Sequence, residues 1–521
     1  MSARSLVAGA TLALCAGLLS TVAPTASTAT ATAGADPGAD ADATTAPGFR
    51  VRPIDWGRCR EGYLRKAGAR CGMLTVPLDH AAPDGPTIRL AVSRVRHRGR
   101  TDNGVMLTNP GGPGGSGLFM ATYGALVPDR VGRTYDWVGM DPRGVGASRP
   151  ALSCDKRIVT LGTRPDYYPR TQAVLDEWVG ISEQYAADCG ASAAARLLPH
   201  LRTTDTVADF EVLREALGAD RVSFYGQSYG TYIAQVYATL HPERIDKLVL
   251  DGVVDPRGIW YSDQLGQQVG FEKSLKRFRQ WVARRHATYG LGRTARAVER
   301  TYYRLVRRFA RHRVDGVASP DLVDLTLGAG YTVGLWPSTA EMLSELATKG
   351  TARIARRTYR SWYPTVEGGD NGYATYLATI CTDAPWPTAL DALFADAARL
   401  DRHHPFFSWP NTWFNQPCAT WPAPAGTPVE IAPADREALL VGESLDGATP
   451  ISGAYEVRRR FTGAVLLEGV GGTTHAGSLS GVACVDDRIA AYLADGSLPR
   501  RRGGAGPDVR CRPVPAPPAG G

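Results

Sequence analysis

Residues 221–254 read RVSFYGQSYGTYIAQVYATLHPERIDKLVLDGVV, and this stretch decides the fold. A short apolar run at 221–225 predicts a strand, the glycine-bounded segment 226–230 a turn, and residues 231–240 a helix. A second apolar run at 245–254 predicts another strand, which ends at Asp-Pro. Strand, helix and strand in this rhythm are typical of a parallel sheet that helices cover on both faces.

The pattern continues on both sides of this stretch. Further strands are predicted at 72–77, 87–96, 104–108, 135–140, 438–441 and 464–467, and helices at 204–217 and 486–494. In the helix at 204–217 the apolar side chains recur at helical spacing, and Gly218 follows as a stop signal. We therefore expect an α/β protein with a mostly parallel, doubly wound sheet.

The turn at 226–230, Gly-Gln-Ser-Tyr-Gly, carries the first candidate catalytic residue. It matches G-x-S-x-G, which is weak evidence alone in a chain with 58 glycines. Between a strand and a helix, however, a sharp turn strains the backbone of Ser228 and lifts its hydroxyl clear of the sheet. A buried serine in an ordinary turn is the alternative. The context favours a nucleophile at Ser228 and the α/β-hydrolase fold.

A serine hydroxyl needs a base to remove its proton, and the base needs a carboxylate to orient it. In α/β-hydrolases both follow the serine along the chain, on loops after later strands. Of nine histidines, only His475 lies beyond the strands at 438–441 and 464–467, in the loop Gly-Gly-Thr-Thr-His. His475 is therefore the predicted base.

Two acidic residues follow the predicted strand at 438–441. Asp446 begins the sequence Asp-Gly-Ala-Thr-Pro, a tight turn that projects a short carboxylate, whereas Glu443 is still close to the end of the strand. We predict Asp446 as the acid. Asp251 or Asp255, after the preceding strand, is a less usual alternative.

The loop at 109–117, Asn-Pro-Gly-Gly-Pro-Gly-Gly-Ser-Gly, follows the strand at 104–108. Hydrolysis places negative charge on the substrate oxygen, and backbone N–H groups must stabilise that charge. The predicted donors are the amide of Gly112 in this loop and the amide of Tyr229 directly after the nucleophile. A phosphate-binding loop is the competing interpretation, but no G-K-[ST] follows it, and we expect no cofactor.

At 521 residues the chain is longer than one ordinary domain needs, so an insertion is expected. The alternation of strands and helices stops near the middle of the chain, and residues 257–425 read as helices rich in Trp, Tyr and Arg. This composition predicts a large helical cap inserted after the sixth strand. The fold core then comprises residues 49–256 and 426–498, and residues 499–521 form a mostly irregular tail.

The N-terminus has the features of a targeting segment. Arg4 precedes the apolar run 6–19, and small residues follow, which predicts a signal peptide at 1–33 and export of the protein. Residues 34–48 lack apolar periodicity and are expected to be a disordered leader. Lipid anchoring at Cys15 is not expected, because a bulky leucine precedes it. No later run is long enough to predict an integral membrane segment.

Eight cysteines follow the predicted signal peptide, an even number that suits an exported protein. Disulfides are the default interpretation, and closure between neighbours along the chain costs the least loop entropy. We predict the pairs Cys59 with Cys71, Cys154 with Cys189, Cys381 with Cys418, and Cys484 with Cys511. A zinc site is the alternative, but the chain offers no CxxC pair or nearby histidine cluster, so no metal is expected.

Basic residues exceed acidic ones by 59 to 51, a formal net charge of +8. So small a surplus over so long a chain is weak evidence for a nucleic-acid partner, and we expect none. Arginines crowd residues 271–313, and we interpret them as a solvated helix face rather than a binding surface. A monomer is expected.

These motifs together resemble one family of α/β-hydrolase serine peptidases, the secreted tripeptidyl aminopeptidases and their proline iminopeptidase relatives. The resemblance covers about residues 50–511. It rests on 109–117, 141–146 (Asp-Pro-Arg-Gly-Val-Gly), 226–231, 446–450 and the closing helix around Cys484. The family's usual Gly-His-Gly is replaced here by Thr-His-Ala. The resemblance implies a secreted peptidase that removes short peptides, with tripeptides as the expected product, from a free N-terminus.

An aminopeptidase must bind the ammonium group of its peptide substrate, which calls for a carboxylate in the cap. The candidates are Glu341, Glu345, Glu367, Asp370 and Asp383. A solvated surface position is the alternative for each. Three other functions stay open: an esterase acting on small acyl compounds, a proline iminopeptidase-like enzyme that removes single residues, and a catalytically silent binding protein. The last is disfavoured because the predicted triad and oxyanion loop are complete.

Overall fold

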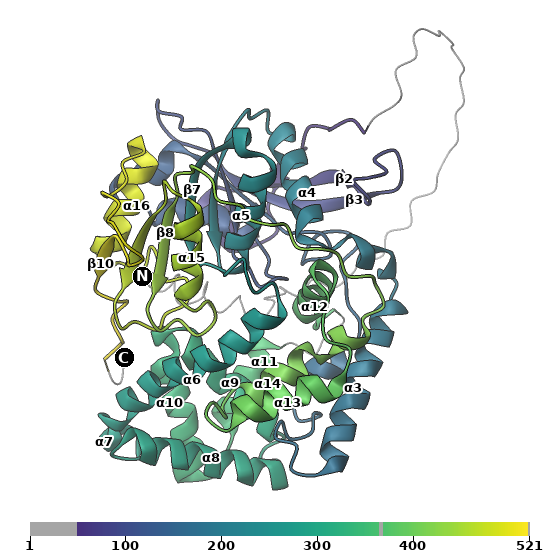
Figure 1. The fold of residues 1–521 in the computed structure, drawn as a ribbon, viewed down its shortest axis with the longest axis vertical. Helices are drawn as coiled ribbons and strands as arrows, with labels where there is room; N and C mark the ends of the chain where they lie inside the picture. Colours follow the sequence, from purple (N-terminus) through teal and green to yellow (C-terminus); the bar gives the residue numbers. More distant parts are fainter. Residues whose placement is uncertain (1–48, 364–367, 519–521) are drawn as a thin grey trace.

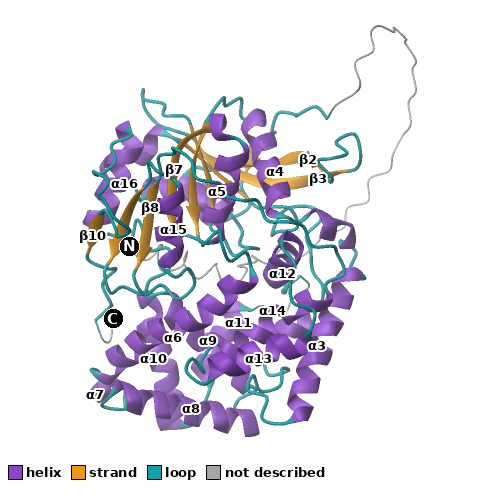
Figure 2. Cartoon of the chain, in the orientation of Figure 1, coloured by secondary structure: helices purple, strands orange, loops and turns teal. Residues whose placement is uncertain are grey.

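The computed structural model describes residues 49–363 and 368–518. The predicted signal peptide, the predicted leader, Cys15 and Glu367 therefore lie outside the described residues. The described chain has two halves (Figures 1 and 2): one is built on a single large sheet with flanking helices, and the other consists of helices.

In the described part of the chain the sheet has ten strands, in the order β1-β2-β3-β5-β4-β6-β7-β8-β9-β10. Their bounds are β1 Gly57–Arg58, β2 Arg70–Pro77, β3 Thr87–Val95, β4 Val105–Asn109, β5 Asp136–Met140, β6 Val222–Gln227, β7 Ile245–Asp251, β8 Leu439–Glu443, β9 Val465–Gly469 and β10 Val509–Cys511. Neighbours from β5 to β10 run parallel, and β1 to β3 add an antiparallel edge. Every residue of β6, β8 and β9 is buried, as central parallel strands require.

Helices cover both faces of this sheet, as the sequence predicts. The helices of this half are α2 Gly62–Ala67, α4 Thr203–Ala216, α5 Tyr229–Leu240, α15 Ser452–Arg460 and α16 Ala483–Asp495. Apolar side chains of α4, α5 and α15, among them Phe210, Ile233 and Val457, share one core on one face. On the other face α16 packs through Ile489 and Leu493. The sheet is therefore doubly wound.

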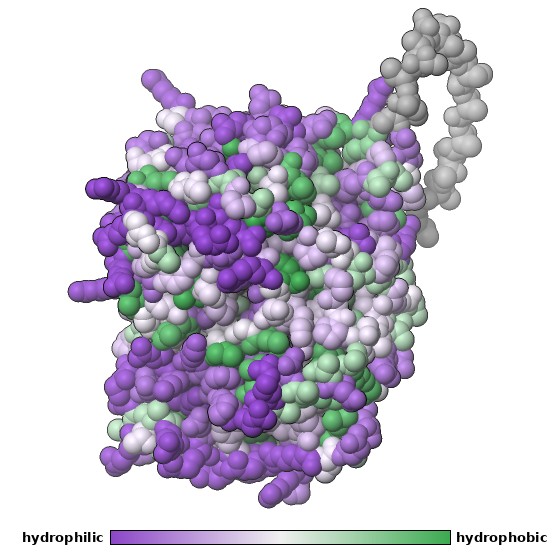
Figure 3. All heavy atoms as spheres, in the orientation of Figure 1, coloured by the Kyte–Doolittle hydropathy of each residue, from purple (hydrophilic) through white to green (hydrophobic). Residues whose placement is uncertain are grey.

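The main part of the helical half follows β7, which is the sixth strand counted from β2. Its helices are α6 Tyr261–Ala283, α7 His286–Tyr289, α8 Ala295–Arg311, α9 Ser319–Tyr331, α10 Trp336–Ser344, α11 Arg353–Trp362, α12 Asn371–Asp383, α13 Leu390–Asp401 and α14 Ser408–Asn415. In α8 the buried residues Val298, Tyr302, Leu305 and Phe309 recur at helical spacing, which leaves the arginines facing outward. Figure 3 shows hydrophilic residues along the edge of the molecule where α7 and α8 lie in Figure 1.

The helical half also contains α3 (Gln172–Gly190), which the sequence-based division assigned to the core. Trp178 of α3 stacks on Trp413 of α14, with ring centroids 5.6 Å apart, and on Tyr167 at 5.3 Å. The chain thus enters the cap once before the main insertion and then returns to the sheet. No change in composition marks this first excursion.

The structure contains the four predicted disulfides, Cys59–Cys71, Cys154–Cys189, Cys381–Cys418 and Cys484–Cys511. The tail, predicted to be mostly irregular, adds the strand β10 beside β9. Beyond β10 the tail reaches the cap, where Nε1 of Trp281 donates to the carbonyl oxygen of Pro517 at 3.1 Å. None of the described helices is long and apolar enough to cross a membrane.

Candidate active site

Ser228 lies between the end of β6 and the start of α5, with φ 55° and ψ −128°. This backbone conformation is costly for a residue with a side chain. Two glycines make the turn possible, because a Cβ on Gly226 would lie 2.4 Å from the carbonyl oxygen of Gly230, and one on Gly230 would lie 2.2 Å from that of Asn109. A side chain at either glycine would collide with backbone, so the sequence at 226–230 specifies this strained turn.

The loop after β4 packs directly against the serine. A Cβ on Gly111 would lie 2.8 Å from Cβ of Ser228 and 2.7 Å from the amide nitrogen of Tyr229. The amides of Gly112 and Tyr229 have no hydrogen-bond partner among the described residues, and Tyr229 is the first residue of α5, where helix amides lack internal partners. The Tyr229 amide thus follows the serine at the positive end of a helix dipole, and Gly112, next to Gly111 in the chain, lines the same cavity as Ser228.

His475 and Asp446 are joined by a hydrogen bond. Nδ1 of His475 lies 2.8 Å from Oδ2 of Asp446. The turn after Asp446 holds its carboxylate, because the amides of Ala448 and Thr449 donate to Oδ1 and the Thr449 hydroxyl donates to Oδ2 at 2.8 Å. The predicted Asp-Gly-Ala-Thr-Pro turn therefore fixes the acid, and Thr449, which the sequence reasoning did not single out, completes its hydrogen bonds.

The His475 ring is fully buried. Burial alone would lower the pKa of His475, but the Asp446 carboxylate, its hydrogen bond to Nδ1 and the nearby Asp251 together raise this pKa above its ordinary value. Nε2 of His475 is buried without a hydrogen-bond partner in the described part of the chain. The ring is thus oriented at Nδ1, and its other nitrogen is free to take a proton.

Ser228 and His475 converge on the end of β7. The amide of Ser228 donates to the carbonyl oxygen of Asp251 at 2.9 Å. A Cβ on the next residue, Gly252, would lie 3.0 Å from Cε1 of His475. The cap holds the histidine from its other side, since the His475 amide donates to the carbonyl oxygen of Tyr331 in α9 and the two rings lie 5.7 Å apart. Sequence reasoning missed Tyr331, because its contact depends on how the cap docks.

The alternative acids have other hydrogen-bond partners. Oδ2 of Asp251 accepts from the amide and the hydroxyl of Ser478, and burial raises the pKa of Asp251 to about 6. Glu443 accepts from the backbone amides of Thr474 and Val514, and burial raises its pKa to about 8. Both carboxyls therefore accept hydrogen bonds from residues on either side of His475 in the chain, and neither is hydrogen-bonded to the imidazole.

A cavity of about 760 Å³ opens above the serine, between the sheet and the cap. Its walls include Gly112, Ser228, Tyr229 and Asp446 from the sheet half, and residues of α3, α6, α9, α11, α12 and α14 from the cap. Of the five predicted cap carboxylates, the four that the structure describes are absent from these walls.

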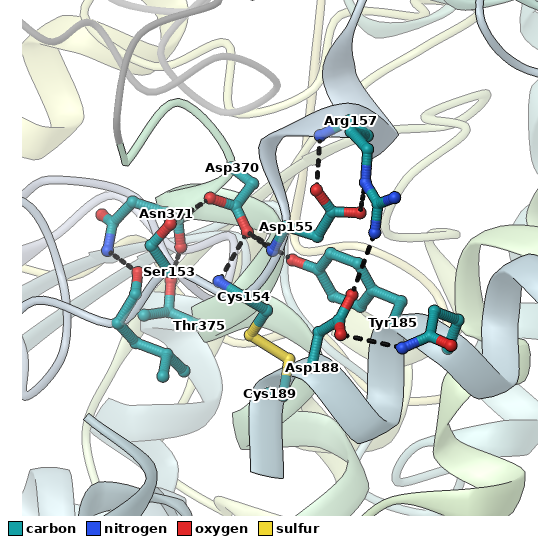
Figure 4. Close-up of a disulfide and its surroundings, with 12 residues drawn as sticks. Ser153, Cys154, Asp155, Arg157, Tyr185, Asp188, Cys189, Asp370, Asn371 and Thr375 are labelled. Carbon is teal, nitrogen blue, oxygen red and sulfur yellow. Dashed lines mark hydrogen bonds and ion pairs between the residues drawn. A yellow bond between two sulfur atoms is a disulfide. The ribbon is translucent and has the colours of Figure 1, made fainter. Parts of the chain in front are cut away.

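Asp370 and Asp383 are engaged in buried structural contacts. Figure 4 shows Asp370 beside the Cys154–Cys189 disulfide, where its carboxylate accepts from Ser153, from the amides of Cys154 and Asp155, and from the Tyr185 hydroxyl. Asp383 accepts from the amide and hydroxyl of Thr203 and from Nε1 of Trp260, and burial raises its pKa to about 6. Donors within the protein therefore bind both carboxylates, and neither residue lines the cavity.

The other two predicted cap carboxylates lie on or near α10. Glu341 is exposed. Glu345 is buried and accepts hydrogen bonds from Thr351, Arg353 and the amide of Ile354. Within residues 49–363 and 368–518, no three His, Cys, Asp or Glu side chains gather as ligands of a metal ion would.

A strained serine at the end of a central strand, two free amides beside it and a histidine paired with an aspartate define a serine hydrolase. The family model of the alpha/beta hydrolase fold matches residues 104–475, and the chain belongs to this family.

Similar proteins have several activities. The chain is 36% identical over 476 residues to the tripeptidyl aminopeptidase of Streptomyces coelicolor, covering 89% of this chain and 87% of that protein. It is 31% identical over 482 residues to the serine protease Hip1 of Mycobacterium tuberculosis, covering 86% and 90%. It is also 30% identical over 509 residues to carboxylesterase B of the same organism, covering 91% and 94%.

Proposed function

We propose that this protein is a secreted serine peptidase that releases short peptides, mainly tripeptides, from the free N-terminus of a peptide substrate. The position of Ser228 carries the proposal, because the serine lines a cavity whose wall is formed largely by residues of the cap helices. A chain end fits such a site more readily than the middle of a chain does. The similarity to a tripeptidyl aminopeptidase over most of both chains supports the choice of substrate.

The first half of the reaction acylates Ser228. Nε2 of His475 takes the proton from the Ser228 hydroxyl as its oxygen attacks the scissile carbonyl carbon. The carbonyl π electrons move to oxygen, and the amides of Gly112 and Tyr229 stabilise this oxyanion. Asp446 stabilises the imidazolium through Nδ1. When the carbonyl re-forms, the C–N bond breaks and the leaving amine takes the proton from Nε2, which leaves an ester on Ser228.

The second half releases the product. Water replaces the departed amine and gives its proton to Nε2 of His475 as the water oxygen attacks the ester carbonyl. The second tetrahedral intermediate collapses, the Ser228 oxygen leaves and recovers the proton, and the short peptide departs with a free carboxylate. The same residues serve both halves, so the reaction needs no group beyond those of the chain and water.

Export is part of the proposal. Disulfides form and persist in oxidising compartments outside the cytosol, and the described part of this chain carries four. Residues 1–33, the predicted signal peptide, would direct the protein there. Expression of the full chain, followed by N-terminal sequencing of the protein in the medium, tests this point. Retention inside the cell with an intact Met1 would contradict it.

A carboxylesterase is the second candidate, because the chain is also similar to carboxylesterase B over most of its length and the same triad hydrolyses esters. A single-residue aminopeptidase of the proline iminopeptidase type is a further alternative. Chromogenic aminoacyl, dipeptidyl, tripeptidyl and ester substrates distinguish the three. We expect the highest kcat/KM on a tripeptidyl anilide with a free amine.

Blocking the amine gives the sharpest test of N-terminal recognition. Acetylation removes the charge and adds bulk, and we expect kcat/KM to fall at least about a hundredfold, the size of a lost charged contact. Ser228→Ala protein serves as the control for contaminating peptidases. Equal rates on free and acetylated substrates would refute the aminopeptidase proposal and leave the serine hydrolase intact.

A further inference from the structure

The cavity wall contributed by α9 carries a carboxylate that the sequence reasoning did not consider. Asp324 lines the cavity, and its side chain is 17% exposed. One Nη atom of Arg164 lies 2.7 Å from Asp324 and 3.1 Å from Asp321, so two carboxylates share a single guanidinium. Asp321 is almost fully buried and accepts hydrogen bonds from the amides of Gly162 and Ala318. Arg164 thus serves two carboxylates, and Asp324 is the one of the two that faces the cavity.

Asp324 has room for another donor. Its Oδ2 accepts from Arg164, and its Oδ1 accepts from the Tyr167 hydroxyl at 2.9 Å. A carboxylate offers about four acceptor positions, so these two contacts leave about two positions open. An ammonium group has three donors and a positive charge, so it suits the open acceptor positions of this carboxylate.

The helix α9 connects this carboxylate to the catalytic residues. Asp324, Leu327 and Tyr331 all line the cavity, and their spacing of three and four residues places them on one face of the helix. Tyr331 contacts His475 through its carbonyl oxygen and its ring. With a rise of about 1.5 Å per residue, Asp324 lies about 10 Å along the helix axis from Tyr331.

That separation matches one product length. Three extended residues span about 10 Å, at about 3.3–3.6 Å per residue, whereas one residue spans only about a third of this. A peptide whose ammonium group is bound at Asp324, lying along α9, would therefore present its third carbonyl at the triad. A single-residue product would require a carboxylate much closer to Ser228.

We propose that Asp324 binds the substrate's ammonium group and that its position on α9 sets the length of the released peptide at three residues. This inference rests on the proposed aminopeptidase function and identifies the specificity determinant of the same site. Asp324 acts here as a binding residue and takes no part in bond breaking.

The cavity wall holds three other carboxylates: Asp446 of the candidate triad, Asp255, which is paired with Arg257, and Asp263. Asp263 forms no ion pair among the described residues, and it lies in the first turn of α6, three residues after Trp260, whose ring contacts Tyr229 at 5.6 Å. An ammonium group at Asp263 would suit a shorter product. Burial, and after it the nearby Asp255, raises the pKa of Asp263 well above its ordinary value. Asp263 is therefore the matched control.

The experiment compares Asp324→Asn with Asp263→Asn. Each purified protein is first titrated with a fluorophosphonate, which labels a working Ser228 and counts folded active sites. For each, kcat/KM is then measured on tripeptidyl anilides with free and with acetylated amines. We expect the wild type and Asp263→Asn to prefer the free amine by at least about a hundredfold. In Asp324→Asn this preference should fall to tenfold or less, through loss of rate on the free amine.

Two further results complete the test. Asp324→Glu keeps the negative charge and should retain most of the preference for the free amine. If Asp324→Asn fails to fold, this variant still tests the assignment, because a glutamate variant without the preference would contradict it. The assignment would be overturned if Asp324→Asn kept the wild-type preference for the free amine, or if Asp263→Asn alone lost that preference. Either result would leave the aminopeptidase function intact. A wild type without any preference would overturn the proposed function itself.

Discussion

The Nδ1 atom of His475 lies 2.8 Å from Oδ2 of Asp446, and the next carboxyl along this part of the sheet, Glu443, is bonded to backbone amides instead. Of these two carboxyls, Asp446 is the one that can stabilise a positive charge on the imidazole through a direct hydrogen bond. The two carboxyls therefore differ in role although only two residues lie between them in the chain.

Asp446→Asn should lower kcat by about three to four orders of magnitude, because the amide can no longer hold the imidazole in the tautomer that leaves Nε2 free. Glu443→Gln should lower kcat by no more than about tenfold, since glutamine has nearly the same shape and its carbonyl can still accept one of the two amides. Steady-state kinetics on a tripeptidyl anilide measures both. The reverse ranking would make Glu443 the acid.

The acidic limb of the pH profile should report His475. This base must be neutral in the free enzyme, and its pKa is raised, so kcat/KM should fall as the pH drops, with a midpoint above the ordinary value of about 6.5. In Asp446→Asn the carboxylate charge is gone and burial dominates, so the midpoint should move to lower pH. An ester substrate without an amine keeps substrate titration out of the profile. An unchanged midpoint in the variant would argue against this pairing.

The backbone at Ser228 should store strain that glycine relieves. A non-glycine residue at φ 55° and ψ −128° costs about 1–3 kcal/mol, whereas glycine elsewhere is about 0.5–1 kcal/mol worse than alanine. Both Ser228→Ala and Ser228→Gly should be inactive. The glycine variant should melt at the same temperature as the alanine variant or at a higher one. Ala395→Gly, at an exposed position inside α13, is the control and should melt lower. If Ser228→Gly melted clearly below Ser228→Ala, the proposed backbone strain at Ser228 would be wrong.

Local patterns suffice to predict the centre of the fold, and they also single out the candidate triad residues. The strand, turn and helix around Ser228 follow from glycine positions and apolar periodicity within about thirty residues. The four disulfides join cysteines that neighbour each other along the chain, so loop entropy alone favours the correct pairs.

The cap residues could not be chosen in this way, because their roles depend on distant partners. Asp370 and Asp383 look like free carboxylates in the sequence, yet Tyr185 and Thr203, almost two hundred residues away, occupy them. Asp324 likewise accepts a hydrogen bond from Arg164, which lies 160 residues earlier in the chain. That arginine lies before α3, in the excursion that the sequence did not reveal.

The C-terminal tail should stabilise the histidine loop. The Val514 amide donates to Glu443, which also accepts the amide of Thr474 next to His475, and Pro517 accepts from Trp281 in the cap. A chain ending at residue 512 loses both tail contacts and leaves Glu443 and Trp281 with unmet hydrogen bonds, each worth about 1–3 kcal/mol when buried.

We expect this truncation to melt several degrees lower and to lose up to about tenfold in kcat, because Thr474 and the histidine after it are then held less firmly. A chain ending at residue 518 keeps these tail contacts and is the control. Calorimetry and fluorophosphonate labelling separate lost stability from lost active sites. Wild-type melting and activity in the shorter chain would mean that Glu443 positions the loop without the tail.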